Sequence, residues 1–315
     1  QNNPNIREIN LAHNSLDSIS TFANLSNVQE LLLSANQIRH VPDLSSLVKV
    51  RRLHLQQNLI EGALSDISGL QFLEEFNIAE NRITAIPDVG NLPKLRSFAA
   101  ANNLIEGALP SFNNCPELLG FNLSNNLISG VMPQYNHLPK LRGLYLQNNM
   151  ISGKLPDFFS NPSIQAVWVA NNEIDSVETF YPNISNLTIN NNKLTFDDII
   201  GNFSFTHFFT SMKPVEANPA FSLQGDSLLV DLKFDAGITT STYRWFKNGA
   251  PNPIAITQVN RLLLAQYAET DTLTVQVTNS QVPSLTLHVL PFNLRDVRPV
   301  IRGVLFKDDN ANCSL

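Results

Sequence analysis

Residues 141–151 read Leu-Arg-Gly-Leu-Tyr-Leu-Gln-Asn-Asn-Met-Ile, and the spacing of this stretch recurs nine times along the chain. Its fixed positions are Leu141, Leu144, Leu146, Asn149 and Ile151. Successive copies are 22 or 23 residues apart, with a last step of 20, and the recurring asparagines are Asn14, Asn36, Asn58, Asn81, Asn103, Asn126, Asn149, Asn172 and Asn192. A repeat of this length predicts coils that stack on one another and share a continuous core.

Each position of the repeat has a physical reason. Leu144 and Leu146 are two residues apart, so a short strand points both into the core and turns Tyr145 toward the opposite, concave face. Asn149 follows where the chain must turn inside the stack, and an amide side chain can both donate and accept hydrogen bonds there. Nine strands about 4.8 Å apart predict a parallel concave sheet on the order of 40 Å long.

This pattern resembles the leucine-rich repeat. Three segments also resemble the Leu-x-Gly-x-Ile-Pro stretch of plant-type repeats, namely Ile105-Glu-Gly-Ala-Leu-Pro110, Ile128-Ser-Gly-Val-Met-Pro133 and Ile151-Ser-Gly-Lys-Leu-Pro156. The resemblance implies a β-rich solenoid with a mostly non-helical convex side over residues 1–212. Its last coil is expected to end in a phenylalanine-rich cap, formed by Phe196, Phe203, Phe205, Phe208 and Phe209.

A second domain is expected at residues 213–292, where alternation replaces the long period. Leu228, Val230, Leu232 and Phe234 lie on one face of a predicted strand. The segments Tyr243-Arg-Trp-Phe-Lys-Asn-Gly249, Thr272-Leu-Thr-Val-Gln-Val-Thr-Asn279 and Leu285-Thr-Leu-His-Val289 resemble strands of an immunoglobulin-like domain, an antiparallel β-sandwich with Trp245 in its core. The family's two cysteines would fall near Leu232 and at Val275, so no disulfide is expected. Its corner tyrosine would fall at Leu273. This domain is interpreted as a spacer.

Residues 293–315 are interpreted as a linker and the truncated start of a further β-sandwich domain. Asp308, Asn310 and Asn312 alternate there as oxygen ligands do in calcium loops, and a solvated turn is the alternative to a bound calcium ion. No other cofactor is expected.

Composition excludes several classes of function. The formal net charge of -6 and the lack of a basic stripe argue against nucleic acid as a partner. No apolar run approaches the roughly 18 residues of a membrane-spanning helix, and the first residues lack the charged and apolar regions of a signal peptide. The six histidines are scattered without a metal-type pair, and no nucleophile or phosphate-loop motif occurs, so the chain is not expected to be an enzyme.

The variable positions of the concave face carry the candidate binding site. The central exposed position reads Asn10, Leu32, His54, Asn77, Ala99, Asn122, Tyr145, Trp168, Thr188. The outward-facing position two residues earlier is charged in early repeats, with Glu8, Glu30, Arg52 and Glu75. In later repeats it is small, with Gly120, Gly143 and Ala166. Large rings above small residues are typical of recognition surfaces, although Tyr145 and Trp168 could instead only pack on each other. The predicted ligand-binding residues are Arg52, His54, Asn122, Tyr145, Gln147, Trp168 and Thr188.

The order of repeats, cap, cysteine-free immunoglobulin-like module and further sandwich resembles secreted surface proteins of Bacteroidetes-type bacteria. That resemblance implies a secreted or cell-surface binding module. Its partner would be a protein on the cell surface or outer membrane, bound on the concave face. Two alternatives stay open, which are glycan binding in a nutrient-uptake complex and a structural stalk or filament.

Overall fold

The computed structural model describes residues 5–23, 25–178, 184–203 and 211–294. The chain divides into two compact units. One consists of the residues up to Val215 together with Thr278–Leu287, and the other begins at Glu216. The fold class is the predicted one, a parallel β-solenoid followed by antiparallel sheets consistent with an immunoglobulin-like sandwich.

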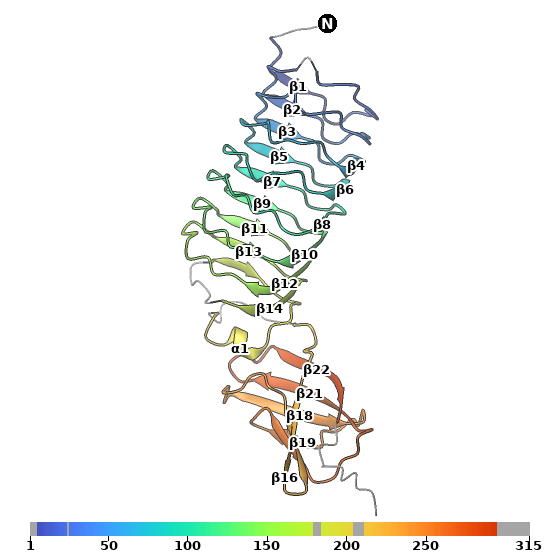
Figure 1. Ribbon diagram of the computed structural model, residues 1–315, viewed down its shortest axis with the longest axis vertical. Coiled ribbons are helices and arrows are strands. Elements are labelled where there is room, and N and C mark those ends of the chain that lie inside the picture. The colour runs from blue at the N-terminus through green and yellow to red at the C-terminus, as the bar shows by residue number, and fades with distance from the viewer. Residues whose placement is uncertain (1–4, 24, 179–183, 204–210, 295–315) are drawn as a thin grey trace, which may run out of the picture. The chain divides into compact units, whose positions relative to one another are not determined.

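The concave sheet has nine parallel strands, one from each repeat, that follow one another in chain order (Figure 1). Tyr145 pairs with Asn122 on one side and with Trp168 on the other, so the central exposed position is in register along the sheet, as predicted. The strands are β1 (Glu8–Asn10), β2 (Glu30–Leu32), β3 (Arg52–His54), β5 (Glu75–Asn77), β7 (Ser97–Ala99), β9 (Gly120–Asn122), β11 (Gly143–Tyr145), β13 (Ala166–Trp168) and β15 (Asn186–Thr188).

Buried asparagine side chains connect successive coils. The Asn149 amide donates to the carbonyl of Leu146 in its own coil and to that of Leu123 in the preceding coil, at 3.1 and 3.0 Å. Its oxygen accepts the backbone N–H of Ile128 at 3.0 Å. Equivalent bonds recur from Asn36 onward, so backbone groups left open by the turns find partners inside the stack.

The opposite side of the coils is also extended, not helical. It carries the pair β4 (Glu61–Ala63) and β6 (Arg82–Ala85), and the sheet of β8 (Glu106–Gly107), β10 (Leu127–Val131), β12 (Met150–Leu155) and β14 (Glu173–Val177). Gly153 has a φ of +73° at an irregularity in the β12–β14 register, a conformation that favours glycine. The helix α1 (Phe196–Ile199) is a single turn.

The solenoid core is filled by the repeated apolar positions, which are almost completely buried. In the middle repeats phenylalanine replaces leucine. The Phe76 and Phe98 rings stack at 5.6 Å between centroids, and Phe121 contacts Phe112 and Tyr135 at 5.0 and 5.3 Å. These rings place extra apolar volume beneath the central strands of the concave sheet. At the end of the repeats Phe196 and Phe203 are buried, whereas Phe205, Phe208 and Phe209 lie outside the described residues.

The strands after Glu216 form two sheets, consistent with an immunoglobulin-like sandwich. One contains β16 (Ala220–Gln224), β17 (Ser227–Asp231) and β20 (Arg261–Leu264), and the other contains β19 (Ala255–Thr257), β18 (Ser241–Lys247), β21 (Thr272–Asn279) and β22 (Thr286–Asn293). Trp245 is fully buried and donates its indole N–H to the Thr257 hydroxyl at 2.9 Å. Leu232 and Val275, at the positions of the family's cysteines, are buried as apolar core residues. Asp308, Asn310 and Asn312 lie outside the described residues.

Candidate binding groove on the concave face

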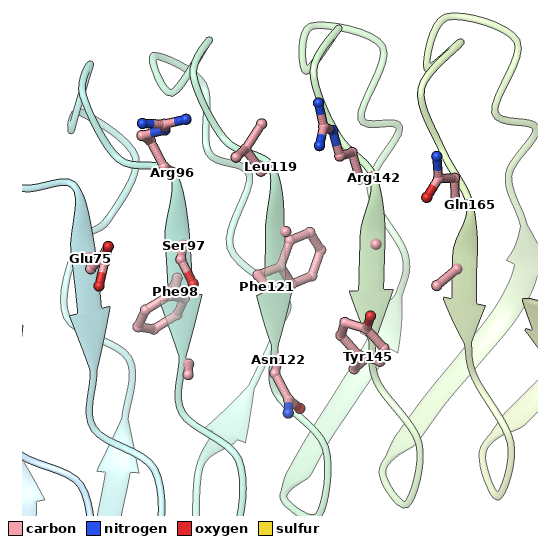
Figure 2. A pocket seen from close by; sticks show the side chains of 14 residues that line it. Glu75, Arg96, Ser97, Phe98, Leu119, Phe121, Asn122, Arg142, Tyr145 and Gln165 are labelled. Atoms are coloured by element: carbon pink, nitrogen blue, oxygen red, sulfur yellow. The ribbon is translucent and has the colours of Figure 1, made fainter.

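A groove of about 600 Å³ crosses the concave face over β5, β7, β9, β11 and β13 (Figure 2). We call it the concave groove. It is lined by Glu75, Arg96, Ser97, Phe98, Ala99, Leu119, Gly120, Phe121, Asn122, Arg142, Gly143, Tyr145, Gln165 and Ala166. It spans several coils, as an extended ligand would require.

Two glycines form the floor of the groove. A Cβ atom on Gly120 would lie 3.0 Å from the carbonyl oxygen of Gly143, and one on Gly143 would lie 3.1 Å from the hydroxyl of Tyr145. The second distance shows that the Tyr145 side chain folds back over Gly143 along its own strand. The small residues therefore create the hollow, and the phenol ring forms part of its wall.

Tyr145 and Trp168 are in contact, as the packing alternative requires. Their ring centroids are 5.0 Å apart and the ring planes are nearly perpendicular, at 86°. Such edge-to-face pairs stabilise aromatic side chains at this distance. Tyr145 also lines the groove, whereas Trp168 lies beside it. The indole therefore supports the phenol ring that lines the groove.

Three further predicted residues, Asn122, Gln147 and Thr188, lie near this pair and differ from one another in their hydrogen bonds. The oxygen of Asn122 accepts the N–H and the hydroxyl of Ser124, at 3.0 and 2.7 Å, and Asn122 lines the groove. The covered Oε1 of Gln147 has no hydrogen-bond partner among the described residues, and neither has the indole N–H of Trp168. Thr188 follows Trp168 in the same row and is half-buried.

The two predicted residues from an early repeat lie outside the groove. Arg52 forms an ion pair with Glu30 in the preceding coil. His54 Nε2 lies 3.5 Å from a carboxylate oxygen of Glu75 in the following coil. The charged early half of the concave face is thus largely paired within itself, which fits a solvated surface.

The sequence-based prediction missed one row of groove residues. Arg96, Leu119, Arg142 and Gln165 each precede a concave strand and stand along one edge of the groove (Figure 2). The prediction considered positions inside the strands and, at Gln147, just after one, but none before a strand. The available signal was the regular recurrence of arginine at this earlier position, at Arg51, Arg96 and Arg142.

The described residues lack two features that would suggest other functions. No group of three or more histidine, cysteine, aspartate or glutamate side chains is placed there to hold a metal ion. No helix among them has the length and apolar character that crossing a bilayer requires. The chemistry that the groove offers is hydrogen bonding, charge and apolar contact.

Comparison with known proteins agrees with the fold. Residues 4–60 and residues 140–162 match family models described as leucine rich repeat. No curated protein matches the chain at a significant level.

Solved structures match more of the chain. The leucine-rich-repeat ectodomain of the Arabidopsis receptor kinase HAESA, solved with an IDA peptide hormone ligand, is 25% identical over 60% of this chain and 34% of its own, with a TM-score of 0.56. A TDR receptor is 24% identical over 61% of this chain and 35% of its own, with a TM-score of 0.54. The chain thus spans about a third of the length of these receptors.

A bacterial structure matches both units of the fold. The functional domain of InlJ from Listeria monocytogenes is 14% identical over 92% of this chain and 62% of its own, with a TM-score of 0.56. At this identity the likeness concerns the fold alone.

Proposed function

We propose that this chain is a non-enzymatic binding module that holds an extended segment of a protein partner in the concave groove. The observation that carries the proposal is the groove itself. It runs across five coils of a rigid sheet, over a floor of Gly120 and Gly143, with Tyr145 as an aromatic wall. A preorganised concave surface with a few polar groups and an aromatic anchor is the usual form of a recognition site.

The HAESA ectodomain supports this proposal, since it was solved with a peptide hormone ligand and shares a quarter of its aligned residues with this chain. The setting that we propose is the cell surface or the secreted space, with a bacterial surface protein as the source, on the strength of the order of modules described above. Residues 213–292 would then serve as a spacer that carries the solenoid.

A selection experiment tests the proposal. A displayed library of random peptides is panned against the full chain, and selected peptides are measured by fluorescence anisotropy against the chain and its Tyr145→Ala/Trp168→Ala variant. We expect peptides that bind the chain and lose most of their affinity for the double variant. A Phe72→Ala variant, which removes an exposed ring outside the concave groove, is the matched control and should bind normally.

Two outcomes would contradict the proposal. Peptides that bind the double variant as tightly as the unaltered chain would move the site away from the groove. The second outcome comes from a glycan array measured in parallel. If oligosaccharides bind at the groove and no peptide does, the ligand is a carbohydrate and not a protein.

A further inference from the structure

One row of side chains, which continues along the edge of the concave groove, has an arginine in every second coil. Arg51, Glu74, Arg96, Leu119, Arg142 and Gln165 occupy the same place in six successive coils. Their backbones continue the ladder of the sheet, since each residue from Glu74 onward donates its N–H to the carbonyl of the preceding one in the row, at 2.7 to 2.9 Å. We call this the entry row.

Among the described residues, only the first arginine of the entry row has an ion-pair partner. Arg51 contacts one carboxylate oxygen of Glu74 through Nε at 2.9 Å and through Nη2 at 2.6 Å. Arg96 and Arg142 have Leu119 between them in place of a carboxylate. Neither guanidinium forms an ion pair or a side-chain hydrogen bond with any of the described residues. Both are exposed and line the groove.

The acidic residues beside them on this edge already have other partners, since Glu74, next to Arg96 in the row, pairs with Arg51 and Glu117 pairs with Lys140. Both carboxylate oxygens of Glu117 accept hydrogen bonds from Lys140 at 2.7 Å. This bond, together with the charges of Lys94 and Arg96, holds the pKa of Glu117 below its usual value. At the far side of the groove the Glu75 carboxylate lies beside His54. The edge at Arg96 and Arg142 is therefore positive, in a chain whose net charge is -6.

The spacing of the two arginines defines the ligand that fits them. They are two coils apart, which at about 4.8 Å per strand separates their backbones by roughly 10 Å. A peptide in the polyproline II conformation has three residues per turn and rises about 3.1 Å per residue, so side chains at i and i+3 point the same way about 9 Å apart. Two carboxylates at this spacing match two guanidinium groups, each of which can bind a carboxylate through a fork of N–H donors.

We propose that the concave groove binds an extended acidic peptide segment whose carboxylate side chains at positions i and i+3 pair with Arg96 and Arg142. This inference rests on the proposed function and names its partner. Leu119, between the arginines, contacts an apolar residue of the peptide, and the peptide runs along the solenoid axis across β7, β9 and β11. The Asn122 oxygen, which already accepts two hydrogen bonds from Ser124, is not available to the ligand.

The test uses synthetic peptides whose only carboxylates are side chains. Each is a fluorescent, amino-blocked and carboxyl-amidated proline-based decapeptide with one leucine and two glutamates, placed either three residues apart or adjacent. A third peptide carries glutamines three residues apart. We expect the first peptide to bind the full chain most tightly and to weaken as salt is added, since salt screens exposed charge pairs.

Substitutions in the entry row assign the contacts. Arg96→Gln and Arg142→Gln are each expected to weaken binding of the first peptide by roughly tenfold to a hundredfold, the usual effect of losing a charge-assisted hydrogen bond. Arg51→Gln is the matched control, because the same residue type in the same row already has Glu74 as its partner. It should leave the affinity unchanged.

Several results would overturn the inference. One is equal binding of the two glutamate spacings, and another is equal binding of the glutamine peptide. A third is an effect of Arg51→Gln as large as that of Arg96→Gln. If the displayed library still selects peptides that depend on Tyr145 but ignore both arginines, the acidic ligand is wrong while the binding module stands. If an anionic polysaccharide binds in a manner that depends on the arginines and no peptide does, both proposals fail.

Discussion

The side-chain oxygen of Asn172 accepts the backbone N–H of Ile151, one coil earlier, at 2.9 Å. The same side chain donates to the carbonyls of Leu146 and Val169, at 2.9 and 3.1 Å, and it is completely buried. A single amide thus holds two neighbouring coils in register at the edge of the proposed site.

Replacing this amide should destabilise the solenoid. Asn172→Ala leaves the Ile151 N–H and the carbonyls of Leu146, Val169 and Ala170 without their side-chain partner, which costs about 3 kcal/mol in free energy of unfolding. Urea unfolding followed by circular dichroism measures the change. The neighbouring Asn171→Gly variant is the control, since Asn171 is exposed and has a φ of +57°, which glycine adopts freely. Equal losses in the two variants would contradict the role of the buried amide.

The hollow over Gly143 should be sensitive to one added methyl group. In Gly143→Ala the new Cβ would lie 3.1 Å from the Tyr145 hydroxyl, so the phenol ring must move. Because that ring packs edge to face on Trp168, the indole N–H signal of Trp168 should shift in the ¹H–¹⁵N spectrum, and peptides selected at the groove should bind several-fold more weakly.

Two internal comparisons make this measurement decisive. The indole signal of Trp245, in the other unit, should stay in place in the Gly143→Ala variant. Gly69→Ala adds the same methyl group where a Cβ meets no atom within 4 Å, and it should leave both indole signals unchanged. An unmoved Trp168 signal in Gly143→Ala would show that the phenol ring does not rest on Gly143.

The repeat itself made the concave face predictable. Strand alternation and the fixed position of Asn149 determine which side chain of each coil faces outward, so the row from Asn10 to Thr188 follows from counting residues. The contact of Tyr145 with Trp168 follows in the same way, because residues at one position of adjacent parallel strands are neighbours.

The groove was harder to predict because it depends on side-chain directions across coils. Tyr145 folds onto Gly143, a choice of rotamer that residue spacing does not determine. The importance of Arg96 and Arg142 rests on the residue that follows each of them in the next coil. Leu119 follows Arg96 and Gln165 follows Arg142, whereas Glu74 follows Arg51 and pairs with it. Reading the entry row as carefully as the strands would have revealed this difference in charge pairing.

The reactivity of the buried Cys115 thiol tests how tightly the coils of the solenoid pack. It is fully covered and donates to the carbonyl oxygen of Val89 at 3.1 Å, and burial raises its pKa. Since the thiolate is the reactive form, we expect Cys115 in a Cys313→Ser variant to react with a disulfide reagent at least roughly 10³-fold more slowly than a free thiol, and to react fully in urea. Rapid, complete labelling in buffer would contradict the packed coil.

Asp271 gives the sandwich a defined response to acid. Its carboxylate lies 2.6 Å from the Lys247 ammonium and accepts hydrogen bonds from the Asn248 amide at 2.8 Å and the Ala268 N–H at 2.7 Å. The Lys247 contact, followed by those from Asn248 and Ala268, lowers the pKa of Asp271 from 3.8 to about 2.

A carboxyl group whose pKa is lower in the folded state stabilises the fold above its unfolded-state pKa, and that stabilisation is lost as the pH falls through the folded-state value. We therefore expect Asp271→Asn to lower the urea midpoint of the sandwich by a constant amount above about pH 5, and the difference to shrink between pH 4 and pH 2. A Trp168→Phe background leaves Trp245 as the sole tryptophan, so fluorescence then reports the sandwich alone. A difference that persists undiminished at pH 2 would contradict the assignment of this stabilisation to the carboxylate charge.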